Sequence, residues 1–255
     1  MLISSAATGD QFLVWGWRIP FLFAGILVIV GLIVRLSLEE PPSFAAKKAA
    51  GELQKAPVLF VLKKFPSQLI LSALIRLSEQ MPFYIFTAFI LDYATSNAGV
   101  DRTFLLIATL AAAVIDLILL PIFARIGDRI GRRKIYFIGC LVLALMAFPY
   151  FWLLDTGEPV LVFIAVSLSL IPHAIQYGAQ ASLISEQFPV QVRYTGAGLG
   201  YQLASLVAGG PAPLIAALLI ATFATGYAVA AYIVLGAVIA AIALKIMKDR
   251  SADAL

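Results

Sequence analysis

Charge is scarce in this sequence, which also has one cysteine and one histidine. Charged residues make up 13% of the 255 residues and hydrophobic residues 62%, whereas a soluble domain is about a quarter charged and about half apolar. This composition excludes a soluble enzyme or a DNA-binding domain, so we expect no nucleic acid partner. The single cysteine, Cys140, excludes an intrachain disulfide, and one cysteine with one histidine leaves no ordinary metal cluster. We therefore expect no metal and no other cofactor.

Catalytic motifs are missing as well. The sequence has no glycine-rich phosphate loop and no nucleophile elbow, which predicts that the protein is not an enzyme. A retinal-binding protein would need a lysine inside the last apolar run, but Lys245 lies at the end of that run.

Long apolar runs are abundant, and each is close to the 20 residues or so that cross a bilayer. Seven of them cover residues 18–37, 68–93, 103–124, 135–154, 160–181, 195–220 and 225–247. The runs from 68 and from 195 are long enough to tilt or to contain a break. The sequence therefore predicts an all-α membrane protein with seven transmembrane helices.

Polar connections divide the chain and set its orientation. We expect a first helix in 1–38, a central linker in 39–66, a six-helix bundle in 67–248 and a tail in 249–255. With seven spans, 15 of the 18 basic residues fall in the connections of one side. Short cytoplasmic loops collect lysine and arginine, so the linker and the C-terminus are predicted to be cytoplasmic and the N-terminus outside.

Polar residues inside the apolar runs are candidates for function, because a charge at mid-bilayer costs at least ~2.5–3.5 kcal/mol. Arg76 and Glu79 share one face of the second run, and Asp116 lies in the middle of the third. In the fifth run a polar stripe follows His173, and it includes Tyr177 and Gln180. These six residues predict a pathway for substrate and protons, with Arg76 attracting an anionic group. The alternatives are an internal Arg76–Glu79 ion pair that fixes helix packing and a His173 that only packs.

A compact charged motif separates the third and fourth runs. It combines a carboxylate, cations and small residues, namely Gly127, Asp128, Arg129, Gly131, Arg132 and Arg133. Gly131 permits a tight turn, and Asp128 can pair with basic groups or with a helix N-terminus. Plain positive charge for anchoring would require neither the Asp nor the Gly.

This motif resembles the signature between helices eight and nine of the major facilitator superfamily, although Ala124 replaces the usual first glycine. Further stretches are similar to the metabolite:H+ symporter branch of that superfamily, and they lie at 15–21, 39–41, 186–189, 192–196, 200–204 and 209–213. Members of that branch carry shikimate, 2-oxoglutarate, citrate, proline, betaine and related compounds with protons.

The resemblance implies a fold, a function and a location. The seven runs would be helices six to twelve, that is, the C-terminal half of a twelve-helix transporter and one preceding helix. We therefore expect proton symport of a small organic acid or zwitterion across the cytoplasmic (inner) membrane, by a truncated or split transporter whose helices one to five come from a separate chain. The charged motif would be the family's cytoplasmic gating latch. The alternatives are an inert transporter fragment, a sugar porter-like protein and a seven-helix sensor.

Overall fold

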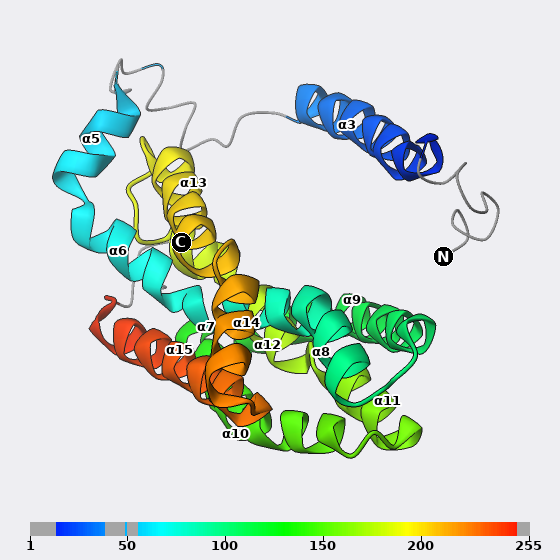
Figure 1. Ribbon diagram of the computed structural model, residues 1–255. Helices are drawn as coiled ribbons and strands as arrows, with labels where there is room; N and C mark the ends of the chain where they lie inside the picture. The colour runs from blue at the N-terminus through cyan, green and yellow to red at the C-terminus, as the bar shows by residue number, and fades with distance from the viewer. Residues whose placement is uncertain (1–13, 39–48, 50–55, 249–255) are drawn as a thin grey trace. The chain divides into compact units, whose positions relative to one another are not determined.

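Helices make up all the regular structure in the residues that the computed structural model describes, which are 14–38, 49 and 56–248 (Figure 1). This confirms the predicted all-α class. Contacts within the chain separate two units, Met1–Leu53 and Gln54–Leu255. The predicted tail 249–255 and most of the predicted linker 39–66 lie outside the described residues.

The first unit contains one long helix. A short turn η1 (Gly16–Arg18) leads into α3 (Ile19–Ser37), where Pro20 occupies the first turn and so needs no helical N–H. Apolar residues surround α3 on all sides, and none of its residues is buried within the described structure. A helix that is apolar all round has the composition of a membrane span.

The second unit is a bundle of helices joined by short turns. Its elements are α5 (Pro57–Lys64), α6 (Pro66–Ile75), α7 (Leu77–Tyr84), η2 (Ile85–Phe89), α8 (Ile90–Asn97), α9 (Arg102–Ile130), α10 (Arg132–Asp155), α11 (Pro159–Leu168), α12 (Ile171–Ser185), α13 (Arg193–Ala204), η3 (Ser205–Gly209), α14 (Ala212–Phe223) and α15 (Gly226–Ile246).

Six helical stretches in the described ranges are long and apolar enough to cross a membrane. They are Gly16–Ser37, Arg102–Ile130, Arg132–Asp155, Pro159–Ser185, Arg193–Phe223 and Gly226–Ile246. A seventh arises if α5 and α6, which meet at an angle of 87°, form one broken span. The remaining predicted run, 68–93, falls on α6, α7, η2 and α8, which follow one another from Pro66 to Asn97.

The two longest predicted runs do contain breaks. η2 and η3 are π-helical turns, and each interrupts one of these runs. Proline explains other irregularities, because its nitrogen carries no proton for the carbonyl four residues earlier. Pro172 lies four residues after Leu168, the last residue of α11, and so leaves the carbonyl of Leu168 without this donor. Pro82 and Pro121 lie inside α7 and α9.

Close packing holds the bundle together. α10 packs against α15 and α12, and α12 packs against α9. A Cβ atom added to Gly178 on α12 would lie 2.8 Å from the backbone nitrogen of Ala124 on α9, so only glycine allows these two backbones to approach so closely. Large buried rings, among them Phe86, Tyr150 and Phe151, fill the main core.

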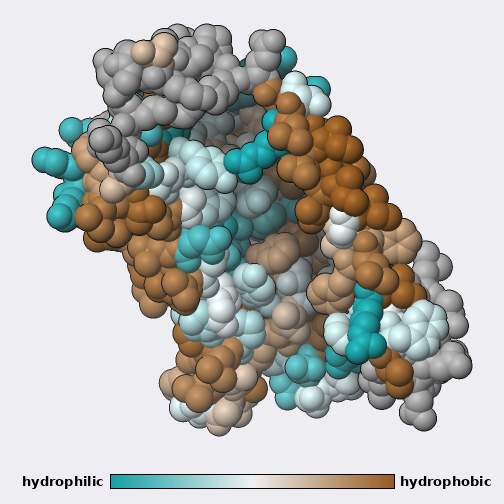
Figure 2. All heavy atoms as spheres, turned by 90° about the horizontal axis from the view of Figure 1, so that it is seen from above, coloured by the Kyte–Doolittle hydropathy of each residue, from teal (hydrophilic) through white to brown (hydrophobic). Residues whose placement is uncertain are grey.

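Much of the surface of the second unit is apolar, as lipid contact requires. Large hydrophobic side chains are exposed on most of its long helices, among them Leu117, Leu145, Val160, Leu214 and Leu235. Figure 2, which draws both units, shows hydrophobic residues in brown over large parts of the visible surface. The structure is that of a multi-pass membrane protein.

Candidate functional site

Broken helix geometry positions the polar residues in the middle of the bundle. Arg76 is the single residue between α6 and α7, and the backbone N–H of Glu79 bonds to the carbonyl of Arg76 instead of Ile75. The carbonyl of Ile75 accepts hydrogen bonds from the hydroxyls of Tyr136 (2.8 Å) and Ser78 (3.1 Å). A buried backbone carbonyl without its helical donor needs such partners, so these side chains stabilise the break beside Arg76.

Pro82 leaves a second carbonyl without a helical donor, that of Ser78. Gln176 on α12 donates to this oxygen from Nε2 at 3.4 Å, and Oε1 of the same amide shares the single hydroxyl proton of Ser78 with the Ile75 carbonyl. Gln176 therefore fastens α12 to the irregular part of α7, and this contact brings the two polar helix faces together.

Four of the predicted pathway residues form one buried charge cluster, which we define as Arg76, Glu79, Asp116 and His173. Nη2 of Arg76 lies 3.2 Å from Oε2 of Glu79. Nε2 of His173 lies 3.4 Å from Oε1 of the same glutamate, and Nδ1 of His173 lies 2.9 Å from Oδ1 of Asp116. The sequence placed these residues on three separate runs, and the structure joins them through His173.

The cluster is buried, so its charges depend on one another rather than on water. The residues Arg76, Glu79 and Asp116 are exposed to 5%, 4% and 9%. A buried charge is tolerated when it is paired and hydrogen-bonded. With a neutral imidazole the cluster holds two carboxylates and one guanidinium, so it is one positive charge short of neutrality.

The contacts of His173 also indicate that the cluster lacks one proton. Carboxylate oxygens only accept, so each of the two contacts of His173 requires a hydrogen between nitrogen and oxygen. A neutral imidazole carries one such hydrogen, so the second contact requires one more, on the ring or on a carboxyl group. The geometry of the cluster therefore suits the binding of one additional proton.

Aromatic rings enclose the cluster. The ring of Tyr177 stacks on His173 at 4.9 Å between centroids, and Phe83 lies 5.0 Å from the same imidazole. The guanidinium of Arg76 lies 4.0 Å from the ring centre of Tyr201 and donates to the Tyr201 carbonyl at 2.9 Å. Tyr177 is 41% exposed, so the stack leads from the buried imidazole to the protein surface.

Gln180 is the last predicted pathway residue. The hydrogen bonds of its amide join two tyrosine hydroxyls rather than the charged groups. Its Oε1 lies 3.0 Å from the hydroxyl of Tyr136 and shares the single proton of that hydroxyl with the Ile75 carbonyl, and its Nε2 donates to the hydroxyl of Tyr201 at 3.4 Å. Gln180 is fully buried. It therefore links Tyr201, which packs against Arg76, to Tyr136, which stabilises the break at Ile75.

Sequence reasoning missed several members of this site. The sequence marks Tyr201 only as part of a family-like stretch, and it does not single out Tyr136 or Ser78. Nothing in their own runs marks them, because each meets its partner on another helix. The signal that could have found Ser78 is Pro82, since a proline four residues later predicts an unpaired carbonyl at this position.

The charged motif 127–133 turns out to be almost entirely helical. Asp128 and Arg129 lie on the last turn of α9, and Arg132 and Arg133 lie on the first turn of α10. Gly131 alone separates the two helices, with a φ of 103° that other residues rarely adopt. The expected loop is thus a one-residue turn, which Gly131 makes possible.

Two acidic residues meet Arg132 at this end of the bundle. The guanidinium of Arg132 donates to Oδ1 of Asp128 from Nη2 at 2.9 Å and from Nε at 3.1 Å. It also donates from Nη1 to Oε1 of Glu186, which follows α12. We call Asp128, Arg132 and Glu186 the basic-end network, since Arg129, Arg133 and Lys134 lie at the same junction of α9 and α10. It ties α9 and α10 to α12.

Comparison with known proteins agrees with this architecture. The Major Facilitator Superfamily model matches residues 2–213 and, in a second alignment, residues 74–253. The shikimate transporter of Escherichia coli is 40% identical over 252 residues, which cover 97% of this chain and 58% of that protein. The inner membrane metabolite transport protein YhjE of the same organism is 35% identical over 231 residues, covering 89% of this chain and 52% of that protein.

A more distant relative is the proline/betaine transporter of Escherichia coli, 28% identical over 258 residues, which cover 98% of this chain and 51% of that protein. The chain thus spans between 51% and 58% of the length of these three relatives. No solved structure matches the chain significantly. The match over most of the chain and the apolar helices long enough to cross a membrane lead to one conclusion: the chain belongs to the Major Facilitator Superfamily, in its branch of metabolite transporters.

Proposed function

We propose that this chain takes part in the proton-coupled symport of a small organic acid or zwitterion across the cytoplasmic membrane, with its N-terminus outside and its C-terminus in the cytoplasm. The names of the relatives, which include shikimate, proline and betaine, support a solute of this size and chemistry. The observation that carries the proposal is the buried charge cluster, which combines a buried guanidinium with a place for one proton.

Arg76 is the residue to which a solute carboxylate would bind. A guanidinium has five N–H donors in a planar fork, which suits a carboxylate. In the structure Glu79 occupies part of this fork, and the Tyr201 carbonyl takes another donor. A solute carboxylate therefore competes with Glu79 for Arg76.

Proton uptake would follow from this competition. Once Glu79 loses Arg76, its remaining partner is His173, which Asp116 holds on its other side. A second buried negative charge is costly without a compensating cation. One proton on His173 or on a carboxylate removes that cost, so solute binding and proton binding favour each other.

The basic-end network would act as the gating latch. Its contacts hold the ends of α9, α10 and α12 together, and their release would free these ends to separate. In transporters of this family the substrate site lies near the bilayer midplane between two halves. We propose that the other half reaches this chain as additional sequence or as a separate chain supplying helices one to five.

Uptake measurements test the proposal. Labelled shikimate, proline and betaine are offered to cells that lack their own carriers and that express this chain, alone or together with the first five helices of the Escherichia coli shikimate transporter. We expect uptake of one of these solutes that increases at acidic external pH and that a protonophore abolishes. Membrane insertion without uptake in either arrangement would favour an inert fragment, and solute binding without flux would favour a sensor.

A further inference from the structure

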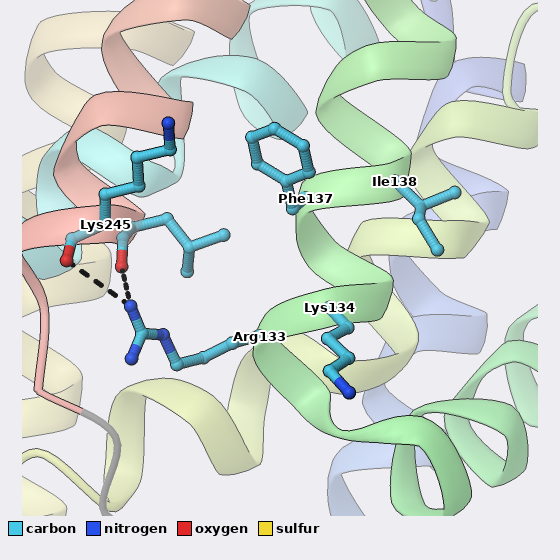
Figure 3. Close-up of a pocket in the computed structure, with 6 residues that line it drawn as sticks. Arg133, Lys134, Phe137, Ile138 and Lys245 are labelled. Atoms are coloured by element: carbon cyan, nitrogen blue, oxygen red, sulfur yellow. Dashed lines mark hydrogen bonds between the residues drawn. The ribbon is translucent and has the colours of Figure 1, made fainter.

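A second polar feature lies outside the transport site, in a cavity between the start of α10 and the end of α15 (Figure 3). Its volume is about 560 Å³, and it is lined by Arg133, Lys134, Phe137, Ile138, Leu244 and Lys245. We call these six residues the basic pocket. Three of them are cationic and three are apolar, and none is acidic.

Arg133 builds the wall of this pocket. Its Nη2 donates to the carbonyl of Leu244 at 2.8 Å and to that of Lys245 at 3.4 Å, so it reaches from α10 across to α15, as Figure 3 shows. Carbonyls at the end of a helix have no helical donors, and arginine commonly satisfies them. This contact fixes the distance between the two helix ends and keeps the cavity open.

Two lysines supply positive charge at opposite sides of the pocket: in Figure 3 the Lys245 side chain extends toward Phe137, and the Lys134 side chain points the other way. Lys134 lies on the first turn of α10 and Lys245 on the last turn of α15, and both are exposed. The N-terminus of α10 and the C-terminus of α15 meet at this pocket, so the opposite ends of their helix dipoles offset each other and the side chains supply the net positive charge. Lysine is a flexible point charge that turns readily toward a phosphate. An anionic group therefore suits this pocket.

The rest of the pocket requires an apolar ligand. Phe137 and Ile138 are exposed to 39% and 41%. Exposed apolar side chains continue along the same two helices at Leu141 (52%) and Ile242 (54%), away from the lysines. The ligand must thus combine an anionic head with long hydrocarbon chains. A free phosphate has no such chains, and a soluble acidic peptide would bury few of these exposed apolar side chains.

We propose that the basic pocket binds an anionic phospholipid, with its phosphate between Lys134 and Lys245 and its acyl chains along Phe137 and Ile138. Basic pockets between membrane helices are suited to anionic headgroups, and each lysine near such a headgroup contributes about a fivefold gain in affinity. The site is independent of the buried charge cluster, because no residue is shared between them.

Native mass spectrometry of the purified chain in detergent tests this proposal. Phosphatidylglycerol and phosphatidylcholine with identical acyl chains are titrated in parallel. We expect tighter binding of phosphatidylglycerol and a loss of about twenty-fivefold in its affinity in the double variant K134Q/K245Q, which follows from about fivefold for each lysine. The charge-conserving variant K134R/K245R should keep the preference and reports on folding.

A matched control comes from Lys63 and Lys64, two exposed lysines at the end of α5. K63Q/K64Q removes the same charge and should change the affinity by less than about twofold. An equal loss in both double variants would overturn the proposal in favour of a general attraction to positive charge. Equal affinity for both lipids, or competition by soluble glycerol phosphate, would overturn it as well. None of these results bears on transport, so the two proposals fail separately.

Discussion

The buried charge cluster and the basic-end network use similar side chains in opposite surroundings. In the first, the side chains of Arg76 and Glu79 are exposed to 6% and 4%. In the second, those of Arg132 and Asp128 are exposed to 29% and 60%. Charges interact strongly where water is excluded and weakly where it is not. Loss of an arginine–carboxylate pair is therefore expected to lower the stability strongly in the middle of the bundle and only slightly at its exposed end.

The largest effect is expected from Arg76→Gln. This variant leaves Glu79 buried without its cation, which costs about 3–5 kcal/mol of stability. Uptake by the assembled transporter should fall by at least about a hundredfold, measured per molecule in the membrane. Thermal unfolding in detergent gives the loss of stability.

The double variant Arg76→Gln with Glu79→Gln is the control for this result. It removes both buried charges, so the stability should largely return while uptake stays absent. A double variant that transports normally would show that the pair only fixes the packing of α7.

Asp116→Asn should have the next largest effect. It keeps the shape of the side chain but removes one of the two carboxylates that contact His173, so the cluster becomes neutral without an additional proton. We expect uptake to fall about tenfold and to lose its dependence on external pH, while exchange of labelled for unlabelled solute persists. An unchanged pH profile would assign proton binding to another group.

Glu186→Gln probes the more buried acid of the basic-end network. The Glu186 side chain is exposed to 7%, and its partner Arg132 is held by Asp128 on the other side. We expect a loss of about 1.5 kcal/mol, since a hydrogen bond between charged groups is weakened but not removed. Chemical denaturation of the purified chain measures it, and a loss above that of Arg76→Gln would reverse the comparison.

The smallest loss of stability is expected for Asp128→Ala. Asp128 is largely exposed and its pair with Arg132 is worth about 0.3–0.5 kcal/mol. Insertion into the membrane should be normal, whereas uptake by the assembled transporter should fall several-fold if the network gates transport. Normal uptake by this variant would remove the latch from the mechanism.

The sequence could predict contacts between residues that are close along the chain, but not contacts between residues that are far apart in it. The helices, the membrane class and the pairing of Arg76 with Glu79 follow from hydropathy and from a spacing of three residues along one helix. The contacts of His173 with Glu79 and Asp116 do not, because they depend on how α7, α9 and α12 are rotated and tilted. The one-residue turn at Gly131 was also out of reach, since the helices extend beyond their apolar segments into charged residues.

α9 and α12 are cross-linked at two levels. Asp116 and Asp128 lie on α9, twelve residues or about 18 Å apart, and their partners on the α12 side are His173 and, through Arg132, Glu186. Two sets of contacts thus connect the two helices, one in the middle of the bundle and one at the helix ends. A change in the angle between α9 and α12 that breaks the contacts at the helix ends must also shift the contact in the middle of the bundle. Under the proposed function, release of the helix ends would therefore also disturb the proposed proton site, and Pro121 lies inside α9 between the two sets of contacts.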